Sequence, residues 1–336
     1  MKKRIIATLS AVLAVILLLF TSAFASSAAD DGLKNVDGKW IYVKDGVKDT
    51  SFTSLVKYYN TWYYVENGEL NWSFTGLTDY YGTKYYVENG VLNWDYTGLA
   101  LLGSDEWYYA ENGAVKNDYT GLTYFCGRWF YVEKSALNWN YTGLTNYYGT
   151  WYYVENGELN WNFTGLTDYY GTKYYVENGV LNWDYTGLAL LGSDEWYYAE
   201  NGAVKNDYTG LTYFCGRWFY VEKSALNWDF TGLTDYYGTK YYVENSILNW
   251  DYTGLALFGS DKWYYAENGT VKNDYTGLVH FGDRWLYVEK SAFNRDYTGL
   301  TNYYGTWYYV ENSILNWNYT GLTKYYDTWY YVENGV

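Results

Sequence analysis

The chain has 336 residues, of which 24% are aromatic, and its formal net charge is −15 at neutral pH. Such aromatic content excludes a disordered chain, because disordered segments are poor in aromatic residues. The negative charge excludes nucleic acid as a partner, since phosphate backbones repel an acidic chain that has no basic stripe. A cationic or neutral partner is expected instead.

The first 25 residues have the pattern of a secretory signal peptide. Residues 2–4 are basic, the run Ile5–Phe20 is apolar, and residues 23–25 read Ala-Phe-Ala, a small-residue cleavage site. A membrane anchor is the alternative, but the apolar run is short for a span of about 20 residues. We therefore expect an exported chain with no transmembrane span after cleavage, whose net charge becomes −18. Residues 26–32 are expected to be a short linker.

The rest of the chain is an internal repeat marked by Thr-Gly-Leu. An imperfect first copy, Thr53-Ser54-Leu55, is followed by twelve markers that recur every 22 or 23 residues. Their glycines are Gly76, Gly98, Gly121, Gly143, Gly165, Gly187, Gly210, Gly232, Gly254, Gly277, Gly299 and Gly321. A period of this length indicates a solenoid or a similar array. We predict about thirteen repeats within residues 33–336.

One unit, Asp79–Gly98, shows why each repeat is predicted to be a β-hairpin. Asn89-Gly90 is a strong signal for a two-residue type I′ turn, which needs positive φ at both positions. The flanking segments Lys84–Glu88 and Val91–Tyr96 are rich in aromatic and β-branched residues, as strands are. A lone hairpin is marginally stable, so successive hairpins must stack. The predicted fold class is all-β, an elongated solenoid of stacked β-hairpin repeats with a 22–23-residue period.

Pairing across this turn predicts which side chains share a face. It places Val87 opposite Leu92, Tyr85 opposite Trp94, and Lys84 opposite Asp95. The inner face would then hold Tyr85, Val87, Leu92, Tyr96 and Leu99. Positions 84 and 86 would line the outer face. Most units carry Trp at position 84, and a position that also accepts Lys must reach water.

The pattern Gly-x5-Gly-x-(Trp/Lys)-Tyr-Tyr-Val-x-Asn-Gly, spanning Gly76–Gly90, resembles the cell-wall-binding repeats of Gram-positive bacteria. That group includes choline-binding repeats, glucan-binding repeats of glucosyltransferases, and repetitive oligopeptides of large clostridial toxins. The resemblance covers almost all of residues 33–336. It implies a β-hairpin solenoid that binds choline or carbohydrate between adjacent repeats. Choline-binding repeats usually continue Thr-Gly-Trp, whose Trp is one wall of the cation cage, and here Leu77 and its equivalents replace that Trp.

The resemblance makes the strand Trp, and the Tyr two residues further on, candidate ligand-binding residues. A Trp face stacks on a sugar ring or attracts a quaternary ammonium by ~0.5–2 kcal/mol, and repetition strengthens weak contacts by ~10²–10⁴-fold. The alternative is that these rings only seal inter-repeat packing. Trp72 and Trp94, in a position that also accepts Asn117, are expected to be half-exposed, either structural or a missing cage wall. The candidate ligand-binding residues are Trp62, Tyr64, Trp107, Tyr109, Trp129, Tyr131, Trp151, Tyr153, Trp196, Tyr198, Trp218, Tyr220, Trp263, Tyr265, Trp307 and Tyr309.

Catalysis and metal binding have little support in the sequence. The single histidine, His280, stands where another unit has Tyr124, and no nucleophile motif flanks it. Acidic loops such as 103–106 match no calcium motif. Cys126 and Cys215 occupy equivalent places several repeats apart, too far for a disulfide. We expect no cofactor, and either two free thiols or an intermolecular bridge.

These observations predict an exported, non-catalytic repeat protein at the cell surface. It would be held non-covalently at the wall, where it binds cell-wall polysaccharide, another glycan or choline-like cations through exposed aromatic residues. A second hypothesis is a structural or adhesive surface protein that binds a host protein or another copy of itself.

Overall fold

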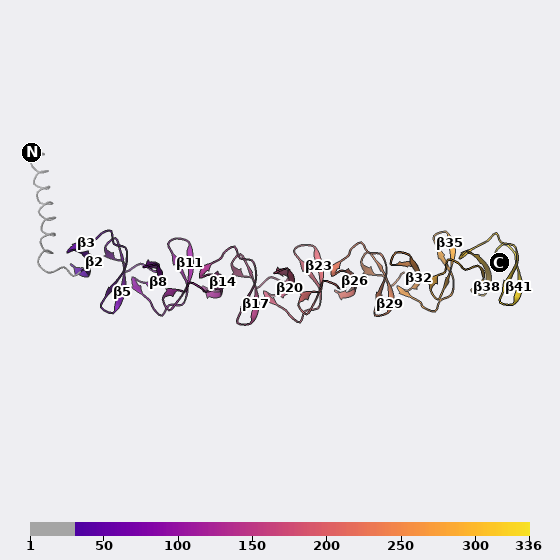
Figure 1. The fold of residues 1–336 in the computed structure, drawn as a ribbon, viewed down its shortest axis with the longest axis horizontal. Coiled ribbons are helices and arrows are strands. Elements are labelled where there is room, and N and C mark those ends of the chain that lie inside the picture. Colours follow the sequence, from indigo (N-terminus) through magenta and orange to yellow (C-terminus); the bar gives the residue numbers. More distant parts are fainter. Residues whose placement is uncertain (1–30) are drawn as a thin grey trace, which may run out of the picture. The chain divides into compact units, whose positions relative to one another are not determined.

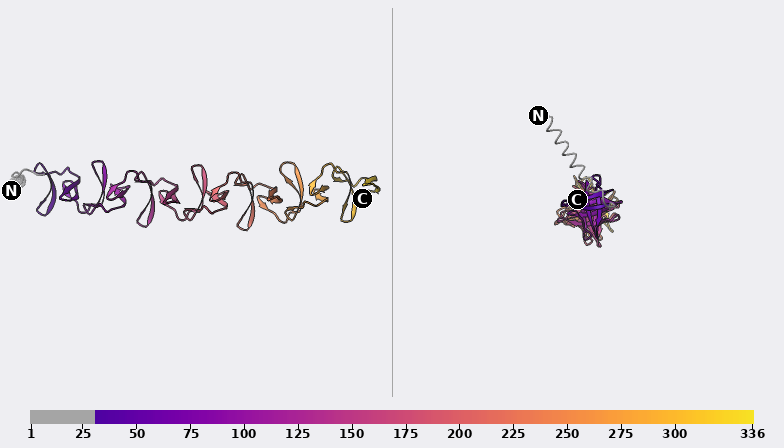
Figure 2. Two further views of the ribbon diagram at one scale, coloured as in Figure 1. Left: turned by 60° about the horizontal axis from the view of Figure 1, so that its bottom comes forward. Right: turned by 90° about the vertical axis from the view of Figure 1, so that its left-hand side faces the viewer.

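The structure is a computed structural model that describes residues 31–336 of the chain. The predicted signal peptide, residues 1–25, and nearly all of the predicted linker, 26–32, lie outside the described residues. The chain divides into two compact units, one ending at Asn162 and one beginning at Phe163. Both consist of strands and turns (Figures 1 and 2). None of the elements within residues 31–336 is a helix that could span a membrane.

Each repeat contains a first strand of five residues, a second of six and a third of two; the last repeat has only the first two, the second with five residues. The first strands are β1 (Gly32–Val36), β4 (Ser54–Tyr58), β7 (Gly76–Tyr80), β10 (Gly98–Leu102), β13 (Gly121–Phe125), β16 (Gly143–Tyr147), β19 (Gly165–Tyr169), β22 (Gly187–Leu191), β25 (Gly210–Phe214), β28 (Gly232–Tyr236), β31 (Gly254–Phe258), β34 (Gly277–Phe281), β37 (Gly299–Tyr303) and β40 (Gly321–Tyr325). The second strands are β2 (Lys39–Lys44), β5 (Thr61–Glu66), β8 (Thr83–Glu88), β11 (Glu106–Glu111), β14 (Arg128–Glu133), β17 (Thr150–Glu155), β20 (Thr172–Glu177), β23 (Glu195–Glu200), β26 (Arg217–Glu222), β29 (Thr239–Glu244), β32 (Lys262–Glu267), β35 (Arg284–Glu289), β38 (Thr306–Glu311) and β41 (Thr328–Val332). The third strands are β3 (Val47–Lys48), β6 (Glu69–Leu70), β9 (Val91–Leu92), β12 (Ala114–Val115), β15 (Ala136–Leu137), β18 (Glu158–Leu159), β21 (Val180–Leu181), β24 (Ala203–Val204), β27 (Ala225–Leu226), β30 (Ile247–Leu248), β33 (Thr270–Val271), β36 (Ala292–Phe293) and β39 (Ile314–Leu315).

The prediction of an all-β array of hairpin repeats is confirmed. The described residues hold fourteen first strands, one more than the marker count, because β1 and β2 form a hairpin ahead of the first marker. The main hairpin of a repeat differs from the predicted one, however. In the unit first considered, β7 pairs with β8, so that Gly76 lies opposite Val87. The turn between them is Tyr81-Gly82, with φ of 51° and 83°.

The predicted Asn89-Gly90 turn is also present and joins β8 to β9. Its φ angles are 49° and 75°, and Val87 lies opposite Leu92 as expected. A Cβ on Gly90 would lie 2.6 Å from the carbonyl oxygen of Asn71, so the turn also packs closely against the preceding repeat. The sequence therefore located this turn correctly.

The strand predicted at Val91–Tyr96 was too long, because β9 ends at Leu92. The next residue, Asn93, accepts a hydrogen bond at Oδ1 from the backbone N–H of Asp95 (2.9 Å). Its Nδ2 donates to Glu88 (2.7 Å). An Asn that hydrogen-bonds the backbone two residues on makes a turn instead of a ladder.

The predicted partners beyond this point were therefore wrong. Lys84 does not face Asp95; it lies opposite Asp79 in the β7–β8 ladder. Tyr85 lies opposite Thr78 in the same ladder, and not opposite Trp94.

Neighbouring repeats are joined by backbone hydrogen bonds and a shared small core. Tyr64 donates its backbone N–H to the carbonyl oxygen of Gly90 in the next repeat (2.9 Å). One cluster of buried side chains takes Leu55 and Tyr64 from one repeat and Val87 and Leu92 from the next. Each repeat thus completes the core of its neighbour, which is the organisation of a solenoid.

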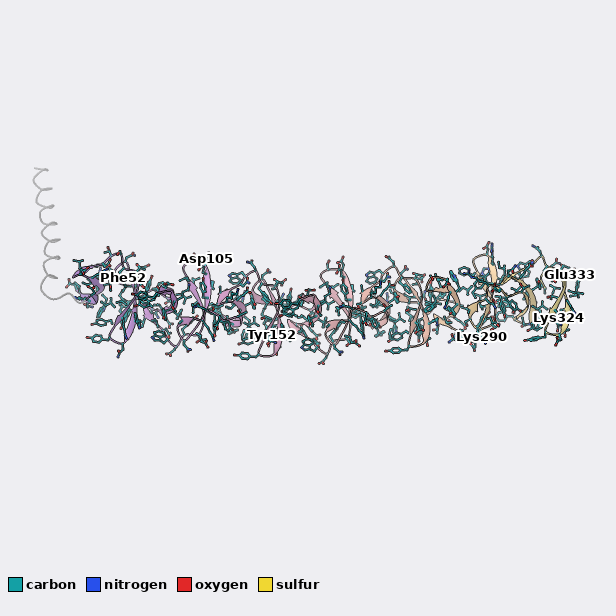
Figure 3. All side chains as sticks on the ribbon, viewed as in Figure 1. Phe52, Asp105, Tyr152, Lys290, Lys324 and Glu333 are labelled. Atoms are coloured by element: carbon teal, nitrogen blue, oxygen red, sulfur yellow. The ribbon has the colours of Figure 1, made fainter. Side chains whose placement is uncertain are left out.

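Stacked ring pairs bridge the second strand and the segment that follows the third strand. Tyr42 stacks on Phe52 (labelled in Figure 3) at 3.7 Å between ring centroids, and Tyr86 stacks on Tyr96 at 3.6 Å. The Tyr96 hydroxyl donates to the carbonyl oxygen of Leu99. Burial raises the pKa of Tyr96 to about 12. These pairs are the structural role of the second Tyr in the repeated Trp-Tyr-Tyr sequence.

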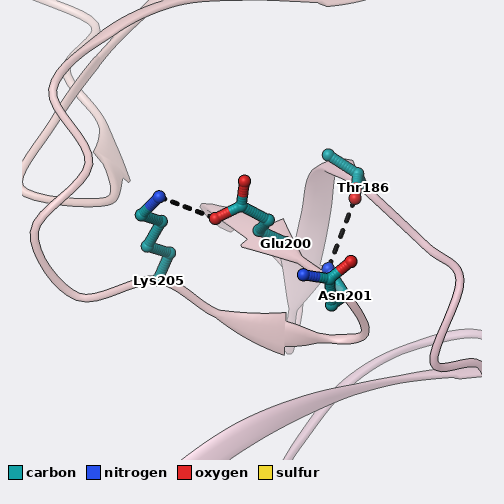
Figure 4. Close-up of polar contacts among 4 residues, drawn as sticks. All are labelled: Thr186, Glu200, Asn201 and Lys205. Atoms are coloured by element: carbon teal, nitrogen blue, oxygen red, sulfur yellow. Dashed lines mark hydrogen bonds and ion pairs between the residues drawn. The ribbon is translucent and has the colours of Figure 1, made fainter.

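The Thr of Thr-Gly-Leu fastens the Asn-Gly turn of its own repeat. Thr186 Oγ1 accepts a hydrogen bond from the backbone N–H of Asn201 at 3.3 Å (Figure 4). On the same turn, Lys205 Nζ lies 2.7 Å from Glu200 Oε2. The glycine of the marker then adopts a φ that L residues rarely take, 151° at Gly187. This pairing explains why the marker and the turn recur together.

Replacing Ser135 with Gly is expected to stabilise the chain. Ser135 occupies the glycine place of a hairpin turn with φ of 70°, and its buried hydroxyl has no hydrogen-bond partner. Removing the strain and the unpaired hydroxyl should add about 1–2 kcal/mol to the free energy of unfolding. Urea unfolding of Ser135→Gly measures this change. Ser246→Gly is the matched control, because the Ser246 hydroxyl bonds the Tyr220 carbonyl oxygen (3.0 Å) and its removal should bring less benefit.

Candidate ligand-binding site: the aromatic seams

In most repeats, a Trp from the second strand packs against a ring from the first strand of the next repeat, and we call this junction a seam. At the seam between β5 and β7, the ring centroids of Trp62 and Tyr80 lie 5.1 Å apart, and the ring planes make an angle of 66°. Nine such pairs lie within the two units at 4.8–5.3 Å: Trp40–Tyr58, Trp62–Tyr80, Trp107–Phe125, Trp129–Tyr147, Trp196–Phe214, Trp218–Tyr236, Trp263–Phe281, Trp285–Tyr303 and Trp307–Tyr325.

A third ring extends many of these seams into solvent. The ring centroid of Tyr81 lies 4.6 Å from that of Tyr80, and Tyr81 is 92% exposed. Its φ of 51° lies in the left-handed region, which costs a bulky residue roughly 1–2 kcal/mol. Strain of this kind concentrates at functional sites. We call the three rings an aromatic triplet, and six occur within the units: Trp40–Tyr58–Tyr59, Trp62–Tyr80–Tyr81, Trp129–Tyr147–Tyr148, Trp218–Tyr236–Tyr237, Trp285–Tyr303–Tyr304 and Trp307–Tyr325–Tyr326.

The eight predicted strand Trp residues lie at the protein surface, partly covered. Seven are half-buried: Trp62, Trp107, Trp129, Trp151, Trp196, Trp218 and Trp263. The eighth, Trp307, is exposed. Seven of the eight have their seam partner within the same unit, as the pairs above show. The structure therefore brings each of these seven Trp residues against a ring of the next repeat.

The predicted Tyr partners do not lie on the outer face, and that part of the prediction was wrong. Tyr64 is 6% exposed and stacks on Phe74 at 3.8 Å. The prediction considered one hairpin alone, whereas the next repeat covers both faces of this end of the strand. The buried set is Tyr64, Tyr131, Tyr153, Tyr220 and Tyr309. The partly buried set is Tyr109, Tyr198 and Tyr265.

Three seams carry Lys in place of Trp, and the ammonium group lies against aromatic rings. Lys84 Nζ is 5.1 Å from the centroid of Tyr108 in the next repeat. Lys173 has the same contact with Tyr197 at 5.2 Å. Lys240 Nζ lies 4.9 Å from Phe258 and 5.4 Å from the Tyr264 ring. Rings of the next repeat thus accept a cation at the distance of a cation–π contact. Phe258 is on a first strand, whereas Tyr108, Tyr197 and Tyr264 are on second strands.

The Leu residues of the markers lie in the core. Leu77, Leu99 and Leu122 are buried, as are most of their equivalents. They line the interior of the repeat, so the third ring of a seam comes from the Tyr81 position instead of the marker position. A sequence signal for this ring existed in the repeated Tyr-Tyr-Gly. Tyr rarely adopts positive φ, so this signal is weaker than that of Asn-Gly.

A second row of Trp residues lies at the turn that follows each third strand. As expected, Trp72 and Trp94 are half-exposed, and Trp72 packs nearly perpendicular to Tyr63 at 5.9 Å. Its ring partner is a residue of the second strand, outside the triplet. The exposed members of this row are Trp72, Trp94, Trp139, Trp161, Trp183, Trp228, Trp250 and Trp317.

The remaining candidate groups lie in repeat positions. His280 faces Trp285 in the ladder, in the register that Tyr124 has with Trp129, which confirms that it is a variant of that strand position. Within residues 31–336, no three His, Cys, Asp or Glu side chains gather in a way that would hold a metal ion. Cys126 and Cys215 form no disulfide with each other, as predicted; both are exposed and stand at the turn position of Tyr81.

Serial hairpins with aromatic seams define the class that the sequence pattern predicted, the cell-wall-binding repeats. The chain belongs to the choline-binding repeat family. The family model described as the choline-binding repeat matches more than half of the chain, over residues 31–49, 51–71, 73–93, 118–138, 140–160, 162–182, 207–227, 229–249, 251–272, 296–316 and 318–336. A comparison with curated protein sequences finds no significant match.

Solved structures of related repeats are similar to this chain at low identity. Choline-binding protein F from Streptococcus pneumoniae, solved with a peptidoglycan analogue, is 22% identical, with a TM-score of 0.30, and the match covers 80% of this chain and 100% of that one. The same protein in complex with ipratropium is 21% identical, with a TM-score of 0.29, and the match again covers 80% of this chain and 100% of that one. An alternansucrase in complex with isomaltotriose is 17% identical, with a TM-score of 0.21. That match covers 54% of this chain and 13% of the enzyme. These TM-scores are below 0.5, so the family assignment rests on the repeat sequences.

Proposed function

We propose that the protein is an exported, non-catalytic surface protein that binds choline-bearing cell-wall polymers through its aromatic triplets. The observation that carries this proposal is the triplet itself. Tyr81 is held at positive φ with its ring in solvent, beside Tyr80 and Trp62. Neither burial nor turn geometry calls for a Tyr there, because Gly or Asn would form the turn with less strain.

Charge supports a cationic ligand group. The chain has a net charge of −15, which attracts cations. Lys84, Lys173 and Lys240, which replace the seam Trp, place their ammonium groups on aromatic rings of the next repeat, so the aromatic surface of this chain already accommodates such a group. A quaternary ammonium on an aromatic face gains roughly 0.5–2 kcal/mol per contact. Membership of the choline-binding repeat family favours the same ligand class.

Repetition supplies the strength that one shallow site lacks. Six triplets recur within the two units, and a wall polymer presents its ligand group many times. Linked weak contacts commonly gain about 10²–10⁴-fold over a single contact. Retention at the wall would then be non-covalent and reversible.

Purified cell walls with a choline-bearing polymer should retain the mature chain, and free choline should release it. The reason is competition for the same rings at every triplet. A pull-down with choline as competitor, and a neutral soluble glycan as the parallel arm, measures this. Release by the glycan but not by choline would contradict an ammonium ligand. Absence of retention would favour the alternative of a structural or adhesive surface protein.

The Trp contribution is tested by changing Trp62, Trp107 and Trp196 together to Ala. We expect weaker retention with circular dichroism unchanged, because all three side chains are half-buried seam rings and Trp62 also belongs to a triplet. Collapse of the β-sheet signal would instead assign them to the structural framework. Tyr64→Ala is the matched core control, expected to destabilise by about 3 kcal/mol or more because a buried ring is lost.

A further inference from the structure

A hollow beside Trp161, separate from the triplets, has the composition of a small-molecule site. Its volume is about 320 Å³, and it is lined by Glu155, Glu158, Leu159, Asn160, Trp161 and Asn162. Ligand sites in proteins commonly measure ~300–1,000 Å³ and combine an apolar wall with a few polar groups. The volume and the lining therefore suit one small ring.

The Trp161 ring is a fixed platform with an open surface. It is 50% exposed, and it packs nearly perpendicular to Tyr152 (labelled in Figure 3) at 5.9 Å. An immobilised aromatic face loses little conformational entropy on binding and presents a flat apolar surface. The apolar side of a sugar ring is complementary to such a surface.

The carboxylates of the hollow are held in place by neighbouring donors. Glu155 Oε2 accepts a hydrogen bond from Asn160 Nδ2 (2.7 Å), and Glu158 Oε2 accepts one from Arg128 Nη1 (3.1 Å). A carboxylate has about four acceptor positions, so both keep acceptor capacity for ligand hydroxyl groups. Two carboxylates at one rim repel an anionic ligand. A neutral, hydroxyl-rich ring fits both the flat Trp face and the remaining carboxylate acceptor positions.

The same combination occurs once more, at Trp72. Glu66 accepts from Asn71 Nδ2 (2.8 Å), and Glu69 pairs with Lys48 (2.5 Å). Elsewhere in the described repeats the position of Glu158 holds Val, Ala, Ile or Thr. Only these two turns combine the half-exposed Trp with both carboxylates.

We propose that the hollow at Trp161 is a saccharide subsite for a neutral sugar ring, and that the turn at Trp72, which has the same Trp and carboxylates, is a second one. The inference builds on the proposed function: the triplets bind the ammonium groups of a wall polymer, and these two sites bind its sugar residues. The two ligand classes are chemically distinct, so each kind of site is testable by itself.

The test titrates neutral trisaccharides into the full mature chain and into Trp72→Asn/Trp161→Asn. Asn occupies this position at Asn117, so the fold tolerates the change. Calorimetry with chitotriose, maltotriose and cellotriose as probes should show at least one that binds the wild type and binds the variant about tenfold more weakly, the equivalent of 1.4 kcal/mol. The matched control is Trp317→Asn, since Trp317 is equally exposed but has Ile314 in place of the second Glu. Its affinity should stay at the wild-type value.

A second variant separates the carboxylates from the platform. Glu69→Val/Glu158→Val copies the residue found at Val91 and should weaken trisaccharide binding several-fold with both Trp residues kept. Equal affinity in wild type and Trp72→Asn/Trp161→Asn, or no binding of any of the three trisaccharides by a chain that still binds choline resin, would overturn the inference. Loss of choline binding by the wild type contradicts the proposed function instead.

Discussion

Raising the pH from 9 towards 12.5 should unfold the repeats in a steep transition. Burial raises the pKa of Tyr96, Tyr185 and Tyr252 to about 12, from an ordinary value of 10. The pKa values of four equivalent residues are raised further by the same cause: Tyr119, Tyr208, Tyr275 and Tyr297. Below pH 10 these phenols are protonated in both states, and their contribution to stability is complete.

Above pH 10 the unfolded chain releases these protons and the folded chain does not, so stability falls as the pH rises through about 12. Seven sites act in the same direction, which makes the expected effect large. Circular dichroism and the part of the phenolate absorbance that comes from these seven buried tyrosines, followed together against pH, should change at one midpoint. Phenolate absorbance that rises near pH 10 for every tyrosine, with the β-sheet signal intact, would contradict this account.

Phe variants provide the control. Phe74, Phe163 and Phe230 stand at the Tyr96 position in other repeats, so Tyr→Phe fits the fold. Replacing all seven tyrosines by Phe should move the alkaline midpoint upwards. The variants should lose roughly 1 kcal/mol per site at neutral pH, because the hydrogen bond to the marker carbonyl is lost.

Changing the turn tyrosines Tyr81, Tyr148, Tyr237 and Tyr304 to Asn should raise stability and strongly weaken wall retention together. Asn tolerates the left-handed region, so each change should relieve about 1 kcal/mol of strain. The same change removes the solvent-exposed ring from four triplets, and avidity should fall about 10²-fold or more. Thermal melts and wall pull-downs on one preparation measure both effects.

The matched control is Tyr170→Asn, a single change at the same kind of turn, with φ of 51°. It should show the stability gain and only a small loss of retention. A four-site variant that is stabilised yet fully retained would remove the triplets from the binding site. One that is destabilised would show that these rings support the turn.

The period, the Asn-Gly turns and the position of the strand Trp were all predictable, because each depends on local spacing. The burial of Tyr64 was not. Alternation along one strand assigns it to the Trp62 face, yet the next repeat supplies Phe74 to cover it. Repeat stacking, which the single-hairpin pattern omits, decides burial at that end of the strand.

The third ring of the site escaped prediction for a different reason. Tyr81-Gly82 forms the main hairpin turn, and φ preferences argue against a Tyr there. Its recurrence as Tyr-Tyr-Gly in many units was visible in the sequence. Likewise Asn93 ended a strand that the apolar pattern would have continued, because its side chain bonds the backbone of Asp95.

Equilibrium dialysis of choline against the mature chain tests the central claim most directly. The account predicts saturable binding with a stoichiometry well above one per chain, because triplets recur along both units. Binding should decrease when the turn tyrosines become Asn. Absence of saturable binding, or binding unchanged in that variant, would contradict the assignment of the aromatic triplets as ammonium sites.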